Sequence, residues 1–247
     1  MRRVAHRERK RRSRLLVLLS GGIDSAVAAL IARDENAELR FLTFDYGQRN
    51  RRELAAARAV ADVIDPKARH DVVRLDLRAV AESGRSALLG APNGGAAAAE
   101  FRYYVPGRNL IFLAHAAALA ESDRRDAVYI GSNLQDARRR DGSGYPDTGR
   151  EFLRLAEETL RRGLKHAASL ELRGPLLDRT KFEAIRIARD HRFDLSLTWS
   201  CYLNGARACG SCDACQARLL SFHWAGMVDT VPYRRSPTQA LLEALRP

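Results

Sequence analysis

The stretch LLVLLSGGIDSAVAALIA at residues 15–32 constrains the fold more than any other part of the sequence. The short aliphatic run 15–19 is typical of a buried parallel strand. Two glycines then allow a tight turn and a close approach of the backbone to a ligand. Residues 25–33 have the pattern of a helix, whose free N–H groups and dipole attract an anion. The stretch therefore predicts a strand, a phosphate-binding turn and a helix.

The turn at 20–25 differs from two common nucleotide-binding loops. No Gly-Lys-Ser/Thr follows it, so it is not a Walker A loop, and it lacks the Gly-x-Gly-x-x-Gly of a dinucleotide fingerprint. A plain strand-to-helix turn capped by serine or aspartate is the alternative interpretation. In a phosphate loop, Ser20 and Ser25 supply hydroxyl donors, and Asp24 fits either as a helix cap or as a Mg²⁺ ligand.

Strand and helix patterns alternate along the rest of the chain. Further strands are expected at 39–46, 70–77 and 126–133, and helices at 51–64, 109–122, 150–163 and 181–191, the last opened by a Thr180–Glu183 capping box. This alternation predicts an α/β fold, with a parallel sheet flanked by helices on both faces. Ligands of such sheets collect at the carboxyl ends of the strands, where the turn at 20–25 falls. Residues 83–107 are expected to form a long loop or lid, and the last quarter shows little regular pattern.

All four cysteines lie close together, in the spacing C-x7-C-x2-C-x2-C: Cys201, Cys209, Cys212 and Cys215. A disulfide scaffold would spread cysteines through the chain, so metal binding is the natural interpretation for a cytosolic protein. Four thiolates favour a closed, structural, tetrahedral Zn²⁺ site over an iron–sulfur cluster. Four thiols without a metal are the remaining alternative.

Charge and hydropathy bear on organisation and location. The formal net charge is +12, and residues 1–14 hold eight basic residues and one acidic residue, which leaves +12 − 7 = +5 for the rest. This basic arm, 1–14, is expected to be disordered, followed by an α/β domain with the phosphate-binding turn at 15–195 and a zinc-binding segment at 196–247. No apolar run of transmembrane length and no secretory signal is present, so a cytoplasmic protein is expected.

Several motifs resemble known families. SGGIDS resembles the signature of the N-type ATP pyrophosphatases, or PP-loop enzymes, which implies a Rossmann-like, adenine nucleotide alpha hydrolase-like fold. Five further stretches are similar to the 7-cyano-7-deazaguanine synthase family of the queuosine pathway, and the resemblance covers roughly residues 15–233. They are FDYGQRNRREL (44–54), YVPGRNLIFLAHAAALAE (104–121), DGSGYPDTGREF (141–152), PLLDRTKFEAI (175–185) and TWSCYLNGARACGSCDACQARLLSFHWAG (198–226).

The resemblance implies an activity and a set of site residues. The activity is that of an ATP-dependent C–N ligase, which converts 7-carboxy-7-deazaguanine and ammonia to the nitrile through an adenylated carboxylate and an amide. It also implies Mg²⁺, structural zinc and a homodimer, without a membrane or nucleic-acid partner. The expected ATP-binding residues are Leu18, Leu19, Ser20, Gly21, Gly22, Ile23, Asp24, Ser25 and Lys181, with Asp24, Ser25 and Lys181 assigned as catalytic.

The expected substrate-binding residues are Arg108, Asn109, Asp141, Tyr145 and Asp147. Arg108 suits bidentate contact with a carboxylate or phosphate. Asn109 is expected to cap the helix that follows it. Asp147 is expected to accept hydrogen bonds from the amino and imino groups of the ring, and Tyr145 to stack on its face.

Three features depart from the family pattern and keep alternatives open. Asn50 stands where the family usually has His, Tyr103 stands where Thr is common, and the spacer LQDARRR before Asp141 adds Arg138–Arg140. A relative could pass the activated deazaguanine acyl group to a protein amine or a metabolite. A less favoured alternative is a PP-loop enzyme that modifies tRNA, because the zinc segment lacks interleaved aromatic residues.

Overall fold

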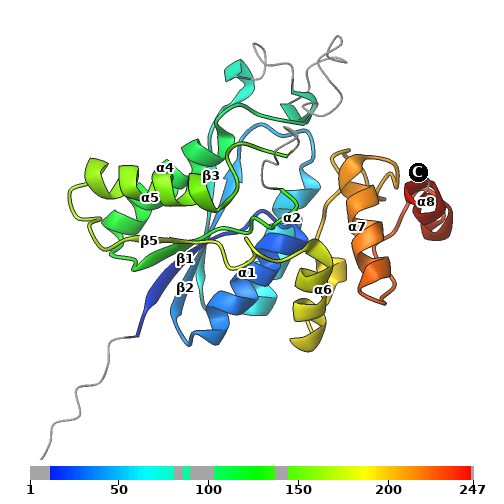
Figure 1. Cartoon of the computed structure of the whole chain (residues 1–247), viewed down its shortest axis with the longest axis horizontal. Coiled ribbons are helices and arrows are strands. Elements are labelled where there is room, and N and C mark those ends of the chain that lie inside the picture. Colours follow the sequence, from blue (N-terminus) through cyan, green and yellow to red (C-terminus); the bar gives the residue numbers. More distant parts are fainter. Residues whose placement is uncertain (1–11, 81–85, 90–102, 137–143, 246–247) are drawn as a thin grey trace, which may run out of the picture.

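A computed structural model describes residues 12–80, 86–89, 103–136 and 144–245. Its centre is a five-stranded, wholly parallel sheet in the order β3-β2-β1-β4-β5 (Figure 1). The strands are β1 (Arg14–Leu18), β2 (Glu38–Asp45), β3 (Arg69–Arg74), β4 (Ala127–Tyr129) and β5 (Glu171–Arg173). The predicted α/β fold class is confirmed.

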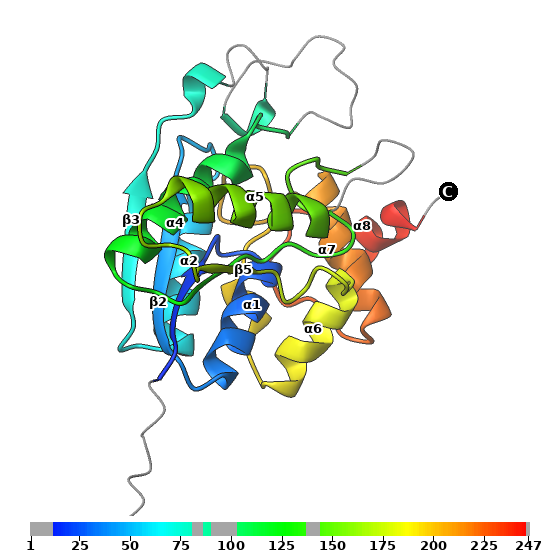
Figure 2. The same cartoon turned by 60° about the vertical axis from the view of Figure 1, so that its left-hand side comes forward.

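Helices cover both faces of the sheet, as Figure 2 shows. On one face lie α1 (Ile23–Asp34), α2 (Arg52–Ile64) and α6 (Lys181–Asp190), and on the other lie α4 (Arg108–Ser122) and α5 (Arg150–Gly163). Side chains alternate along β1 as a strand requires. Leu15 and Val17 join the core under the first set of helices, and Leu16 and Leu18 join the core under the second.

The order of the strands places a topological switch point beside β1. The chain runs outward from β1 through β2 to β3, and then returns through α4 to β4 on the opposite side of β1. The segments that follow β1 and β4 therefore leave the sheet in opposite directions and open a crevice between them. The glycine turn at 20–25 lies at this crevice.

The C-terminal quarter is more regular than its sequence indicates, so that expectation is wrong. It contains η3 (Leu195–Leu197), α7 (Asp213–Trp224) and α8 (Pro237–Ala244), and α7 packs between α6 and α8. Polar side chains occupy core positions of α7, so its sequence does not show the apolar stripe of an amphipathic helix. Arg218 is only 2% exposed and forms an ion pair with Asp229 through two hydrogen bonds of 2.7 and 3.0 Å. The expected domain boundary at 195/196 falls inside η3.

Element ends differ from expectation in smaller ways. The structure adds β5, and β4 occupies only the first part of the strand expected at 126–133. Most of the expected loop at 83–107 lies outside the described residues, apart from the short helix η1 (Ala87–Leu89) and the residues before α4. The basic arm also lies outside them up to residue 11. None of the helices in the described ranges is long and apolar enough to cross a membrane.

Candidate active site

A cavity of about 300 Å³ opens at the carboxyl ends of β1, β2 and β4. The turn after β1, the start of α6, the start of α4 and the segment before α7 all line it. Of the residues expected to bind ATP, all but Gly21 line this cavity: Leu18, Leu19, Ser20, Gly22, Ile23, Asp24, Ser25 and Lys181. Segments far apart in the sequence thus meet at the predicted edge of the sheet.

Hydrogen bonds between its own residues shape the turn after β1. The Ser25 hydroxyl donates to the Gly22 carbonyl at 3.0 Å, and the Ser20 hydroxyl donates to Ser25 Oγ at 3.0 Å. Gly22 is the N-cap of α1, and no side chain caps this helix end. The cap role considered for Asp24 is therefore wrong, because its carboxylate points to another helix instead. The first turn of α1 keeps N–H groups free for an anionic ligand.

Two glycines allow the close packing around this turn. Gly21 has φ +83°, and a Cβ there would lie 2.3 Å from the backbone oxygen of Glu53. Gly131 follows β4, and a Cβ there would lie 2.5 Å from the backbone nitrogen of Ser25. The sequence pattern predicts no role for Gly131. The structure shows that it lets the segment after β4 touch the N-terminus of α1 across the switch point.

Replacing Gly131 with alanine is expected to destabilise the fold by about 1–3 kcal/mol, the usual effect of overpacking, and to weaken ATP binding by displacing the turn. Chemical denaturation and calorimetric titration with ATP measure the two effects. The matched control is Gly163→Ala at the end of α5, where an added Cβ meets nothing within 4 Å. A Gly131→Ala protein that binds ATP as tightly as this control would contradict the packing described here.

Lys181 lies opposite the turn, at the start of α6. The predicted capping box is confirmed, with Thr180 Oγ1 accepting from the Glu183 N–H at 3.4 Å, and it fixes the direction of this helix end. Lys181 Nζ contacts Asp24 Oδ2 at 2.9 Å. Although burial opposes it, the negative charges of Asp24 and Asp136 raise the pKa of Lys181. Lys181 therefore stays a cation beside the phosphate-binding turn.

Asp136 is a site residue that sequence reasoning missed. It lines the cavity, burial raises its pKa, and the Lys181 charge opposes that rise while Asp24 adds to it. Among the described residues, Asp24 Oδ1 is buried without a hydrogen-bond partner. Two carboxylates, one with an unpartnered oxygen, suit a hard divalent cation. The sequence feature that could have indicated Asp136 is its position after β4, at the switch point. It was overlooked because the surrounding stretch, LQDARRR, resembles a plain spacer.

Arg108 and Asn109 begin α4 and also line the cavity. The N-cap of α4 is Gly107, with φ 65°, which has no side chain to cap the helix, so the expected cap role of Asn109 is wrong. Instead, the Asn109 amide donates to the Asp147 carbonyl at 2.9 Å, and the Asp147 carboxylate accepts from the Asn109 N–H at 3.1 Å. Arg108 and Asn109 line the cavity, whereas Asp147 lies behind them and holds the helix end.

Aromatic side chains form the walls near Arg108. Tyr103 and Tyr202 lie 4.1 Å apart between ring centroids, and Phe112 stacks on Phe44 at 4.2 Å. All four line the cavity, together with Tyr46 and the predicted Tyr145. Flat apolar walls with a cation at their edge suit a planar heterocycle that carries an acid group. The predicted site residue Asp141 and the inserted Arg138–Arg140 lie outside the described residues.

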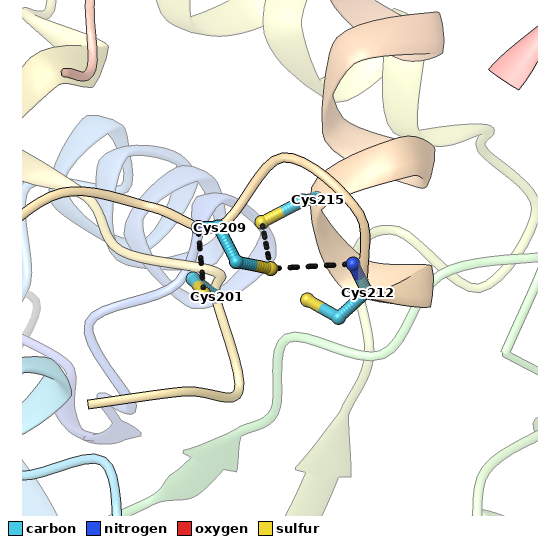
Figure 3. Close-up of side chains that lie close together, drawn as sticks. All are labelled: Cys201, Cys209, Cys212 and Cys215. Carbon is cyan, nitrogen blue, oxygen red and sulfur yellow. Dashed lines mark hydrogen bonds between the residues drawn. The ribbon is translucent and has the colours of Figure 1, made fainter. Parts of the chain in front are cut away.

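The four predicted cysteine ligands come together as one buried group (Figure 3). Their sulfur atoms all lie within 4.8 Å of one another. Backbone N–H groups of Leu203 and Cys209 donate to Cys201 Sγ at 3.4 and 3.3 Å. Hydrogen bonds from Cys212 and Cys215 lower the pKa of the Cys201 thiol to about 2, despite burial. This group could hold a metal ion with all four positions filled by protein.

The cysteine segment also contributes to the cavity. Trp199, which lines it, donates its backbone N–H to the Gly21 carbonyl at 2.8 Å and its indole N–H to the Cys201 carbonyl at 3.1 Å. The Arg52 guanidinium lies 3.9 Å from the centroid of the Trp199 ring. The cysteine segment therefore touches the phosphate-binding turn directly.

Asn50 also connects the cysteine segment to the rest of the protein. It is 3% exposed and donates to the Cys201 carbonyl at 2.6 Å, and it does not line the cavity. This departure from the family pattern therefore acts on the cysteine segment. Tyr103, by contrast, does line the cavity.

The first strand of the parallel sheet is followed by SGGIDS, and a lysine lies opposite that turn. These features define a PP-loop nucleotide-binding protein. The chain belongs to the family described as queuosine biosynthesis protein QueC, whose model matches residues 14–226. It is 37% identical over 225 residues to 7-cyano-7-deazaguanine synthase of Nautilia profundicola, covering 89% of this chain and 98% of that protein. It is 38% identical over 233 residues to the synthase of Thermosynechococcus vestitus, covering 90% and 96%. Among solved structures, NMN synthetase from Francisella tularensis matches with a TM-score of 0.47 and 13% identity, covering 94% of this chain and 81% of that one.

Proposed function

We propose that this protein is an ATP-dependent C–N ligase that converts 7-carboxy-7-deazaguanine and ammonia into 7-cyano-7-deazaguanine. The proposal is supported by family membership and by relatives named 7-cyano-7-deazaguanine synthase, which match about nine-tenths of the chain. The observation that carries it is one cavity that brings two kinds of group together. The phosphate-binding turn and Lys181 line it, and so do Arg108 and a set of aromatic side chains. Such a cavity can bring the α-phosphorus of ATP to the carboxylate of a planar heterocycle.

Each residue has a task in this chemistry. The free N–H groups of the turn and Lys181 would bind the phosphates of ATP, and Asp24 and Asp136 would hold Mg²⁺, which offsets phosphate charge. Arg108 would pair with the substrate carboxylate, while Tyr145 and its aromatic neighbours stack on the ring. ATP adenylates the carboxylate oxygen, and ammonia then displaces AMP to give the amide. A second ATP activates the amide oxygen, and loss of AMP leaves the nitrile.

The remaining assignments are also proposals. Four thiolates with no open position suit structural Zn²⁺ at Cys201, Cys209, Cys212 and Cys215. Contacts of Asp141 and Asp147 with the substrate remain predictions, as does a role for Ser25 beyond shaping the turn. We also propose a homodimer that works in the cytoplasm, on the strength of the family resemblance.

The test is incubation with 7-carboxy-7-deazaguanine, ATP, Mg²⁺ and ammonium, followed by mass analysis of products. The expected result is nitrile, AMP and pyrophosphate, with AMP formation lost in Asp24→Ala because the cation and phosphate contacts go together. ADP as the product, or equal turnover by the variant, would contradict the proposal. AMP with amide only, or with the heterocycle retained on protein, would instead favour transfer to another acceptor.

A further inference from the structure

Glu53 is a carboxylate in the cavity that the steps above leave without a role. It lies in the first turn of α2 and lines the cavity together with Ser20 and Arg108. Its backbone oxygen lies against Gly21, where an added Cβ would come within 2.3 Å, so the residue starts directly beside the phosphate-binding turn. Glu53 therefore shares the cavity with the phosphate-binding turn and with Arg108, whose charge acts on its carboxyl group.

Three neighbours face this carboxyl group, Tyr46 and Gln48 from the segment after β2 and Arg108 from the start of α4. Burial raises the pKa of Glu53 to about 7, while the Arg108 charge and a hydrogen bond with Gln48 act in the opposite direction. Tyr46 is the third neighbour, and burial raises its pKa above its ordinary value, so it stays a neutral phenol. Around neutral pH the Glu53 carboxyl is thus present in both its protonated and its ionised form.

The other groups around the cavity are less suited to accept a proton. Asp24 and Asp136 lie beside the Lys181 cation, Arg108 is a cation itself, and burial raises the pKa of Tyr145 and of Tyr202. No histidine lines the cavity within the described residues. Among those residues, Glu53 is the one cavity carboxylate that does not face Lys181. Glu53 is therefore the cavity carboxylate best suited to accept a proton, and its backbone lies beside the phosphate-binding turn.

We propose that Glu53 is the general base that removes protons from the reacting nitrogen. This rests on the proposed function. In the first round, the ammonia lone pair forms the C–N bond to the adenylated carboxyl carbon. Glu53 takes one N–H proton as the bond from that carbon to the AMP oxygen breaks and its electrons leave with AMP. In the second round, Glu53 takes the N–H proton of the adenylated imidate while the C–O bond breaks, which forms the nitrile. Solvent removes the proton from Glu53 after each step.

The test separates adenylation from nitrogen attack. Exchange of labelled pyrophosphate into ATP, driven by 7-carboxy-7-deazaguanine, reports adenylation alone. Glu53→Gln is expected to keep this exchange within about 3-fold while amide formation falls by about 10²–10⁴-fold, the usual contribution of a general base. Glu53→Asp should recover part of the loss. The matched control is Glu151→Gln, the same substitution in the exposed first turn of α5.

A pH profile and a stability profile complete the test. At a fixed concentration of free ammonia, wild-type amide formation should rise as pH passes through about 7 and then level off, and Glu53→Gln should show no such rise. The pKa is raised in the folded state, from 4.5 to about 7, so ionisation costs stability as pH rises through this window. Glu53→Gln should therefore gain in Tm relative to wild type between about pH 4 and about pH 8, values on either side of that range.

Unchanged amide formation in Glu53→Gln would overturn the inference. Loss of the exchange reaction together with amide formation, in a variant with undiminished Tm, would also overturn it, because Glu53 would then act in adenylation. A wild-type protein without substrate-dependent exchange would instead contradict the proposed function itself.

Discussion

Lys181→Met is expected to lower the rate of AMP formation by about 10²–10³-fold, the effect of removing one group that stabilises transition-state charge. Lys181 is the cation that faces the phosphate-binding turn from α6, and it contacts Asp24 at 2.9 Å. Without it, charge that develops on the leaving pyrophosphate loses a partner. The measurement is AMP release under saturating ATP. The matched control is Lys165→Met, which removes an exposed lysine away from the cavity.

The same change is expected to cost about 3–5 kcal/mol of stability, because it leaves the buried carboxylates of Asp24 and Asp136 without their cation. Burial raises the pKa of Asp136, and the pKa would rise further without the opposing charge of Lys181, so the variant should lose stability as pH rises and regain it under acidic conditions. Adding Asp136→Asn to Lys181→Met should restore much of the Tm at neutral pH without restoring AMP formation. Recovery of both together would show that Lys181 acts only through folding.

Loss of the metal proposed at the four cysteines is expected to have the second largest effect. Four buried thiols are then left close together, and structural metal sites contribute several kcal/mol to folding. For a chain of this size, Tm should fall by about 10 °C on removal of the metal by a strong chelator or in Cys215→Ser. Thermal melts with and without chelator measure the change. Ser211→Ala, an exposed position between two of the ligands, is the matched control.

Metal removal is also expected to weaken ATP binding, although no cysteine lines the cavity. The reason is the hydrogen bond from the Trp199 N–H to the Gly21 carbonyl, which joins the cysteine segment to the phosphate-binding turn. Calorimetric titration of the metal-depleted protein with ATP, below its melting temperature, tests this link. An affinity equal to that of the metal-loaded protein would show that the turn keeps its shape alone.

Local patterns predicted most of the fold. The aliphatic run of β1 and the capping box of α6 are features of adjacent residues, so the sequence shows them directly. The pattern failed in α7, where Arg218 takes a core position because Asp229, eleven residues later, neutralises it. A single sequence does not indicate which distant carboxylate meets a buried arginine. The same limit hid β5, whose three residues pair with β4 only in the folded sheet.

The candidate site, like the fold, could be predicted from the sequence only in part. The turn after β1 and the cysteine ligands could be predicted because each is one short motif with a chemical reason for its spacing. Asp136 was missed because it lies in a stretch that resembles a spacer. Glu53 was missed although it lies in FDYGQRNRREL, because nothing in that stretch indicates a chemical role for it, and the folded sheet brings both residues to the cavity. Asn109 was misassigned because its side chain meets Asp147, and the N-cap role falls to Gly107.

The wall formed by Trp199, Ser200 and Tyr202 has a consequence for protein synthesis. A nascent chain that has left the ribosome only as far as α6 already carries the glycine turn and Lys181, yet it lacks this side of the cavity. Such a chain would leave its nucleotide site open to water on one flank. Productive use of ATP would then begin only after translation of the last fifth of the chain and its folding around the metal.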